Sequence, residues 1–257
     1  MRTLSAAGIL EAWERGSSQV PAEQALMLLA AACPERTGDE LAALPLGARD
    51  ALLLTARQRL FGAELTSFAR CPVCASALEF TAQVDDLRAG PRVDETPSAV
   101  SPPFHTTMLP VGSDVPAAQV TYRLPTGGDL IALQDISEPA AFRLALAERC
   151  IVEATWGGAT VSTSELPDAA LAALAAAMSA SDPQAEVLLD LTCPACGASW
   201  QTVFDIATYF WAELAAEAKR LLREVDALAR AYGWREVDIL ALSPGRRQAY
   251  RELLWTF

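Results

Sequence analysis

The sequence predicts an α+β fold with a helical N-terminal layer, a small central β-structure around a zinc-ribbon-like four-cysteine site, and a long C-terminal helix followed by two shorter helices. Three observations support this prediction. Apolar residues recur at helical spacing near both ends, strand-like alternation flanks two Cys-Pro-x-Cys motifs, and 52% of the 257 residues are hydrophobic. A chain of this length and composition can bury a sizeable core.

The N-terminal segment, residues 1–63, is predicted to be helical. Pro21 occupies the first-turn position that proline favours, and polar residues precede the apolar runs. The expected helices cover residues 5–14, 21–33 and 48–60. The apolar face expected on the third helix consists of Ala51, Leu54, Ala56 and Leu60.

The central segment, residues 64–204, is predicted to be an α/β region bracketed by the two cysteine motifs. Residues 77–84 alternate between apolar and polar, which predicts a strand, a knuckle and a second strand at the first motif. The second motif has the same context. Residues 85–103 are rich in Asp, Pro, Gly and Ser and are expected to form a surface loop. Further strands are expected over residues 106–109, 120–124, 186–191 and 199–204, and helices over residues 126–134, 139–150 and 168–178. The expected N-cap of the first of these helices is Thr126 or Asp129.

The C-terminal segment, residues 205–257, has the clearest helical pattern. Apolar residues recur at steps of three, four or seven from Ile206 to Tyr232, with Asp205 as the expected N-cap and Gly233 as the stop. The shorter helices are expected over residues 237–241 and 244–254. The long helix has apolar residues on a second side as well. This side must pack within the chain or contact a partner protein, and the sequence leaves both possibilities open. The candidate partner-binding residues are Trp211, Leu222, Trp234, Arg246, Arg247 and Trp255.

Four of the six cysteines predict a metal site. Cys71 and Cys74, like Cys193 and Cys196, are separated by two residues, a spacing that lets both sulfurs of a pair reach one zinc ion. We expect one structural zinc per chain, because four thiolates leave no open coordination position. The alternatives are free thiols or a redox pair, although strand-like sequence follows both motifs where a redox motif would open a helix. The other two cysteines, Cys33 and Cys150, lie in apolar surroundings.

Charge and histidine content argue against several functions. The net charge of −12 disfavours attraction to nucleic acid or anionic membranes, and the Arg246, Arg247 and Arg251 cluster lies in a segment with eight basic and eight acidic residues. His105 is the only histidine, which restricts acid–base catalysis. We therefore expect no enzymatic activity and no small-molecule substrate. Because no secretory signal or membrane-length apolar run is visible, we expect a cytoplasmic protein.

Several motifs together resemble a known family. They are the Cys71–Cys74 knuckle followed by Leu78–Phe80, then Tyr122–Leu130, Ala145–Ile151, Leu191–Gly197, Phe204–Ile206 with Phe210 and Trp211, Ala231–Trp234, Asp238–Leu240 and Ser243–Tyr250. From about Leu65 onward the chain is similar to the baseplate hub assembly chaperone family of T-even-like contractile tailed phages and its relatives in contractile injection system clusters.

The resemblance implies a non-enzymatic structural or assembly protein that binds hub or spike proteins and can be incorporated into a phage-tail-like particle. Two alternatives stay open on the residues alone: a zinc-ribbon nucleic-acid-binding regulator, and a metal-dependent or redox enzyme.

Overall fold

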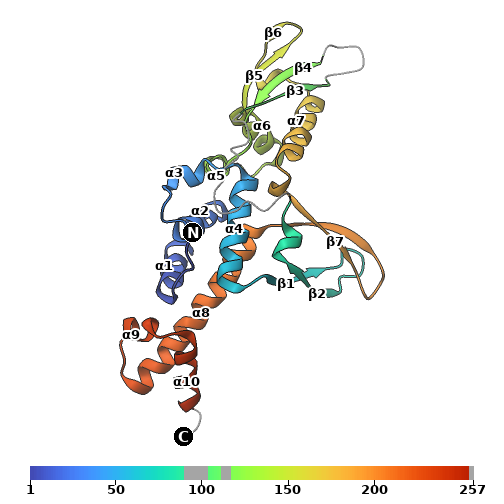
Figure 1. Ribbon diagram of the computed structural model, residues 1–257. Coiled ribbons are helices and arrows are strands. Elements are labelled where there is room, and N and C mark those ends of the chain that lie inside the picture. Colours follow the sequence, from blue (N-terminus) through green and yellow to red (C-terminus); the bar gives the residue numbers. More distant parts are fainter. Residues whose placement is uncertain (90–103, 111–116, 255–257) are drawn as a thin grey trace.

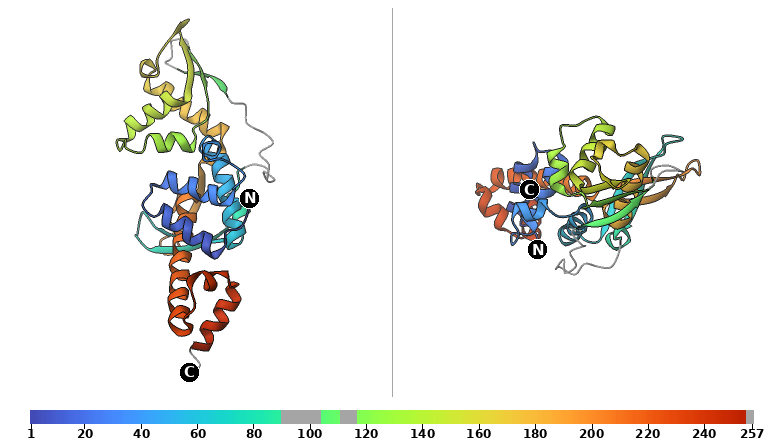
Figure 2. Two further views of the ribbon diagram at one scale, coloured as in Figure 1. Left: turned by 90° about the vertical axis from the view of Figure 1, so that its left-hand side faces the viewer. Right: turned by 90° about the horizontal axis from the view of Figure 1, so that it is seen from above.

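The computed structural model describes residues 1–89, 104–110 and 117–254. The molecule is elongated, with a small sheet at one end, helices in the middle and a helical hairpin at the other end (Figures 1 and 2). Two β-hairpins project sideways from the middle. No helix of the described ranges is both long enough and apolar enough to cross a bilayer.

The N-terminal layer is helical, as predicted. Its helices are α1 (Ala6–Gly16), α2 (Pro21–Ala32), α3 (Gly38–Ala42) and α4 (Leu46–Phe61). The Ser5 side chain accepts a hydrogen bond from the Gly8 amide, which caps α1. Helix α3 was not predicted, although Thr37 and Glu40 form a capping box that marks its start.

The buried face of α4 differs from the predicted one. Leu54 and Ala56 are buried, but Ala51 and Leu60 are only half-buried. Arg57 is buried instead, and its guanidinium binds both carboxylate oxygens of Glu213, at 2.8 and 2.7 Å. An apolar stripe could not reveal this face, because part of it is a charged pair with a distant helix.

The two cysteine motifs each lie in an antiparallel hairpin, as predicted. The strands are β1 (Glu64–Arg70) and β2 (Ala77–Gln83), then β7 (Val187–Thr192) and β8 (Ser199–Phe204). Along each strand, exposed residues alternate with buried or half-buried ones. Each hairpin is a separate two-stranded sheet. The short 3-10 helix η1 (Val84–Leu87) follows β2.

A four-stranded antiparallel sheet forms the distal end. Its order is β3 (His105–Leu109), β4 (Ala118–Tyr122), β5 (Ile151–Trp156) and β6 (Ala159–Thr160). The helical elements around it are α5 (Gly127–Ala132), α6 (Pro139–Cys150), η2 (Thr163–Glu165), α7 (Asp168–Ser181) and η3 (Pro183–Ala185). Both expected caps act at α5, because Thr126 and Asp129 form a capping box.

Strands β5 and β6 were not predicted. They are joined by Gly157 and Gly158, whose φ values of 60° and 84° suit the tight hairpin turn that glycine pairs favour. This glycine pair is the sequence signal that marks the hairpin. The expected loop over residues 85–103 begins with η1, and its residues 90–103 lie outside the described ranges.

The C-terminal helices match their predicted positions. They are α8 (Ile206–Tyr232), α9 (Glu236–Ala241) and α10 (Pro244–Leu254). The Asp205 side chain accepts hydrogen bonds from the Ala207 and Thr208 amides, and Gly233 ends α8 with a φ of 70°. Helix α8 contacts α1, α2 and α4 along its first half and α9 and α10 along its second. It is therefore largely sandwiched within the chain.

Two hydrophobic cores result from this arrangement. One joins the N-terminal helices to the first half of α8, with Phe210 and Leu214 fully buried among them. The other lies between the distal sheet and α7. The division into segments 1–63, 64–204 and 205–257 remains a prediction.

Candidate metal centre

The two cysteine knuckles have the same backbone structure. In the first, the Cys71 amide donates to the Ser76 carbonyl and the Ala75 amide to the Cys71 carbonyl, both at 3.0 Å. In the second, the Cys193 amide donates to Ala198 at 2.8 Å and the Gly197 amide to Cys193 at 2.9 Å. The fifth residue of each knuckle has a positive φ, 59° at Ala75 and 73° at Gly197. Each turn therefore presents its two sulfurs in the same way.

The four sulfurs of the predicted site form one cluster at the tips of the hairpins. They lie within 4.8 Å of one another, and two pairs across the hairpins, Cys71–Cys196 and Cys74–Cys193, are 3.6 Å apart. A tetrahedral zinc ion with Zn–S bonds of about 2.3 Å requires sulfurs about 3.8 Å apart. A disulfide would need about 2.05 Å. The spacing fits a four-thiolate metal centre, which would leave no position for water or substrate.

Burial and hydrogen bonding divide the four cysteines into two kinds. Cys71 and Cys193 are buried, whereas Cys74 and Cys196 are exposed. The Val73 amide donates to Cys71 Sγ at 3.4 Å, and Cys74 Sγ lies 3.3 Å from Ser76 Oγ. Hydrogen bonding with Ser76 and the neighbouring thiols lowers the pKa of Cys74 to about 6. The Ala198 backbone lowers the pKa of Cys196, but the contacts with the other three thiols and burial outweigh this and raise it to about 12. A lowered pKa favours the thiolate that metals bind.

The remaining cysteines lie in the interior, as their apolar surroundings suggested. Cys33 and Cys150 are both buried away from the cluster. Burial raises the pKa of Cys150 to about 11, and it also raises the pKa of Cys33. These thiols stay protonated near neutral pH and fill space in the core.

Three of the predicted partner-binding residues are half-buried or partly exposed. Trp211 packs against Gly16 of α1, where a Cβ atom would come within 2.4 Å of the indole ring. Trp234 stacks on Tyr232 with ring centroids 4.8 Å apart and meets the ring of Tyr250 edge-on. Leu222 is 37% exposed. The two tryptophans contribute mainly to packing within the chain.

The other three predicted residues differ sharply from one another. Arg246 is exposed. Arg247 is 2% exposed, and its guanidinium donates to Glu224 at 3.0 Å and to the Leu242 carbonyl at 2.7 Å. Glu224 also binds Arg220 and Arg251. Arg247 therefore holds α10 on α8 inside the chain, while Trp255 lies outside the described residues.

A second buried carboxylate holds the Tyr122–Leu130 motif together. Asp129 binds Arg123 at 2.6 and 2.8 Å and Arg149 at 2.8 Å. Burial raises the pKa of Asp129, but the hydrogen bonds from both arginines outweigh this effect and hold it well below its ordinary value. The motif therefore ties α5 to α6 and to the segment that follows β4, a role that sequence reasoning did not identify.

The single histidine lies at the start of β3, where it stacks on Tyr122 with centroids 5.3 Å apart. Its Nε2 atom has no hydrogen-bond partner among the described residues. Within the same residues, the four cysteines are the one group of three or more metal-binding side chains that could share an ion. The geometry thus singles out the hairpin tips.

Comparisons with known proteins agree with the resemblance of the motifs to phage baseplate proteins. Residues 8–211 match the family described as T4 bacteriophage base plate protein, which covers most of the chain. Curated proteins and solved structures gave no match. The matched region includes both hairpins, all four clustered cysteines and the start of α8. The chain belongs to the T4 bacteriophage base plate protein family.

Proposed function

We propose that this chain is a non-enzymatic structural or assembly (chaperone) protein of the baseplate hub of a contractile phage-tail-like injection system. Its partners in this proposal are hub or spike proteins, which it binds in the cytoplasm or within the particle. The observation that carries the proposal is the family match over residues 8–211. The two cysteine hairpins and the C-terminal helices, which both extend from the helical middle, supply surfaces for such partners.

The cofactor in this proposal is one structural zinc ion per chain, held by Cys71, Cys74, Cys193 and Cys196. Zinc is supported by the all-sulfur donor set and by sulfur separations of 3.6 Å, close to the edge of a zinc–thiolate tetrahedron. Its role would be to fix the tips of two hairpins whose knuckles are 118 residues apart in the sequence.

The C-terminal helices offer an apolar surface to partners. Val237 of α9 is 64% exposed, Leu253 of α10 is 51% exposed and Leu222 of α8 is 37% exposed. Arg246 is exposed on the same segment. We assign partner binding to these residues, because Trp211, Trp234 and Arg247 already have contacts within the chain.

Copurification with hub proteins tests this assignment. The chain would be co-expressed with hub and spike proteins of the same particle, as the parent and as a Val237→Asp, Leu253→Asp double variant. We expect the amount of hub protein that copurifies with the variant to fall at least about tenfold. Burying one apolar side chain contributes about 1.5–3 kcal/mol to binding. Point variants are preferable to deleting residues 234–257, which would remove Arg247 and leave Glu224 without a buried partner.

A matched control tests whether the loss of binding is specific to the C-terminal helices, or follows the replacement of any exposed apolar side chain. Val152→Asp changes a valine of similar exposure, 56% against 64% at Val237, on the distal sheet. The control should copurify like the parent. If the double variant also retained hub protein at the parental level, the C-terminal helices would be excluded as the hub-binding surface.

The charge of the hairpins opposes the nucleic-acid alternative. Strands and knuckles over residues 64–83 and 187–204 contain one basic residue, Arg70, and three acidic ones, Glu64, Glu79 and Asp190. A nucleic-acid-binding ribbon needs a basic surface. We expect no salt-sensitive retention of the protein on immobilised DNA.

A further inference from the structure

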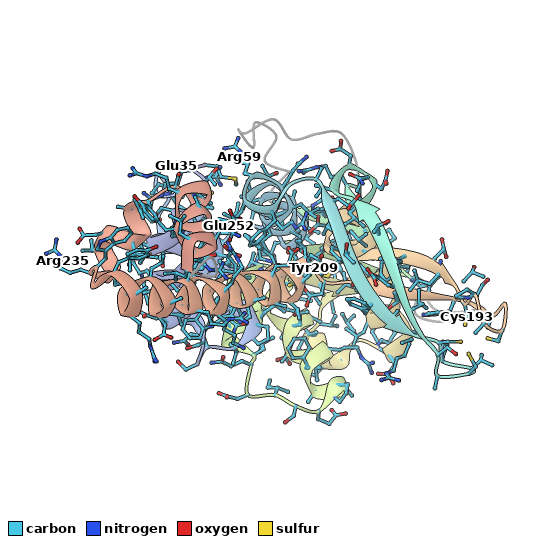
Figure 3. The ribbon with its side chains drawn as sticks, turned by 90° about the horizontal axis from the view of Figure 1, so that it is seen from below. Glu35, Arg59, Cys193, Tyr209, Arg235 and Glu252 are labelled. Carbon is cyan, nitrogen blue, oxygen red and sulfur yellow. The ribbon has the colours of Figure 1, made fainter. Side chains whose placement is uncertain are left out.

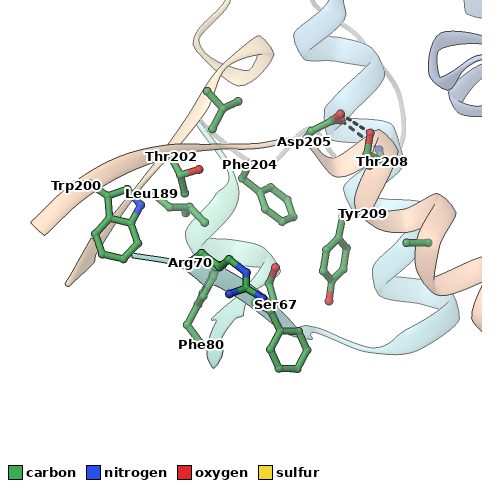
Figure 4. A pocket seen from close by; sticks show the side chains of 14 residues that line it. Ser67, Arg70, Phe80, Leu189, Trp200, Thr202, Phe204, Asp205, Thr208 and Tyr209 are labelled. Atoms are coloured by element: carbon green, nitrogen blue, oxygen red, sulfur yellow. Dashed lines mark hydrogen bonds between the residues drawn. The ribbon is translucent and has the colours of Figure 1, made fainter. Parts of the chain in front are cut away.

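The two hairpins enclose a cleft of about 500 Å³ between their facing sides and the start of α8 (Figure 4). Aromatic side chains dominate its walls: Phe80 comes from the first hairpin, Trp200 and Phe204 from the second, and Tyr209 from α8. Phe204 and Tyr209 have ring centroids 5.5 Å apart. The cleft therefore offers flat apolar surfaces from three separate elements.

Two polar groups of the cleft are already engaged within the protein. The Tyr209 hydroxyl donates to the Thr66 carbonyl at 2.8 Å. The Asp205 carboxylate accepts hydrogen bonds from the amides at the start of α8 and from the Thr208 hydroxyl. At the end of the cleft beside the start of α8, a bound segment would therefore contact mainly aromatic rings and few free hydrogen-bonding groups.

Arg70 supplies an unpaired positive charge at the other end. It is the last residue of β1, it is exposed, and it lines the cleft. Its guanidinium donates to the Ala75 carbonyl at 3.4 Å, and no carboxylate of the described residues lies within 4.0 Å of it. Arg57 and Arg247, by contrast, are each paired with a glutamate. In a chain with a net charge of −12, this arginine is available to an acidic partner.

The cysteine cluster shapes the cleft. Among the described residues, the hydrogen-bond-distance contacts between the two hairpins are those between the cysteine sulfurs, Cys71–Cys196 and Cys74–Cys193. The bases of the hairpins meet at the core through Ala82, Val187 and Phe204. The hairpins are thus joined at both ends and open between them, so the clamp sets the separation of the aromatic walls.

We propose that this cleft binds a segment of another baseplate protein that presents an aromatic side chain next to a carboxylate. The ring would lie between Phe80, Trp200 and Tyr209, and the carboxylate would pair with Arg70. Aromatic rings in such surroundings attract one another beyond the effect of their buried area, because the edge of one ring meets the face of another. The proposal rests on the proposed function, because it assumes that the chain binds other baseplate proteins.

Peptide binding to the full-length metal-loaded protein tests the proposal. The probe is acetyl-Phe-Glu-amide, and the matched probe is acetyl-Phe-Gln-amide, which lacks the charge. Binding is followed through the backbone amide resonances of the isotope-labelled chain. We expect saturable shifts at Ser67, Thr202 and Thr208, with about fivefold tighter binding of the Glu peptide, the upper range for an exposed ion pair.

Three variants separate the ring site from the charge site. Arg70→Gln should abolish the preference for the Glu peptide while leaving binding of the Gln peptide unchanged. Ala212→Trp fills the cleft from an exposed position on α8 and should abolish binding of both peptides. The control, Arg246→Gln, removes an exposed arginine on α10 and should behave like the parent.

Equal affinity of the parent for both peptides, shifts outside the cleft, or unchanged binding to the Ala212→Trp variant would overturn the proposal. Its failure can be told apart from failure of the proposed function. If hub proteins copurify with the Arg70→Gln and Ala212→Trp variants at the parental level, the hub role stands and the cleft is excluded.

Discussion

The hairpin arm and the C-terminal projection extend from the same helical middle but are held together by different chemistry. The arm comprises β1–β2, β7–β8 and the two knuckles, and the projection comprises the second half of α8 with α9 and α10. Figure 3 labels Cys193 at the tip of the arm and Arg235 in the C-terminal projection, on opposite sides of that view. The arm depends on four sulfurs at its tip, whereas the projection depends on Glu224 and its arginines.

The difference follows from the distances along the chain. The two hairpins are separated by 118 residues between their knuckles, and two-stranded ribbons have little core of their own. The projection is formed by consecutive helices, with Glu224 and Arg247 only 23 residues apart, so short loops already keep its parts together. A cross-link therefore adds more to the arm than to the projection.

Removal of the clamp should have the largest effect on stability. We expect Cys193→Ser or chelation to lower the free energy of unfolding by more than about 4 kcal/mol, the order of magnitude for opening a loop of this length. Elemental analysis should find about one zinc per parent chain and none in the variant, and thermal unfolding should shift to lower temperature.

Cys33→Ala is the control for this prediction. Cys33 is a buried cysteine outside the cluster, so its loss should leave the zinc content unchanged. A chelated protein that unfolds at the parental temperature would show that the metal does not stabilise the arm. The arm and the projection would then differ less in what stabilises them.

Loss of the central carboxylate of the projection should have the next largest effect. Glu224→Gln leaves the buried guanidinium of Arg247 without its counter-charge, and we expect a destabilisation of about 3 kcal/mol in urea unfolding. The control is Asp226→Asn, which breaks an exposed pair with Arg230 on the same helix and should cost less than about 0.5 kcal/mol. Equal effects of the two variants would contradict a special role for Glu224.

The sequence predicted the features that depend on neighbouring residues, and it did not predict those that depend on contacts between distant ones. The cysteine knuckles and the ends of α8 depend on residues close together in the chain, such as Cys193 with Cys196 and Asp205 with the amides of the first turn. The arginine contacts depend on three-dimensional packing: Arg247 resembles a surface residue until α10 folds back onto α8. The cleft also could not be predicted, because its walls come from hairpins distant in the sequence.

The helical middle from which both parts extend should respond to pH through Asp50, a buried residue of α4. Burial raises the pKa of Asp50 to about 6, against the opposing effect of Arg49. Because this folded-state pKa lies above the unfolded value of about 4, the folded protein binds more protons between pH 4 and 6, and Asp50 lowers stability as pH rises through this window. We expect Asp50 to contribute about 2 kcal/mol to this change, measured by urea unfolding at pH 4.5 and 7.

Asp50→Asn should remove the part of this pH dependence that Asp50 contributes. Burial also raises the pKa of Asp182, so a smaller dependence of the same sign should remain. Asp129 cannot produce it, because its pKa is held low and its contribution is lost only as pH falls below about 4. An unchanged slope between pH 4.5 and 7 in the Asp50→Asn variant would assign the effect to another group.

The smallest predicted changes in stability come from substitutions at equivalent positions in the two knuckles of the arm. Ala75 and Gly197 occupy equivalent positions with positive φ, a conformation that costs a residue with a Cβ atom about 1 kcal/mol. Apart from its chain neighbours, no heavy atom of the described residues lies within 4 Å of a Cβ added at Gly197, so Gly197→Ala should destabilise the protein by about 1 kcal/mol through the backbone alone. Ala75→Gly is the reverse change at the equivalent position and should stabilise the protein by a similar amount, because the entropy that glycine loses on folding offsets the backbone effect equally in both directions. Thermal unfolding of the zinc-loaded proteins measures both changes. Shifts of the same sign would show that the knuckles, despite their shared hydrogen bonds, are not energetically equivalent.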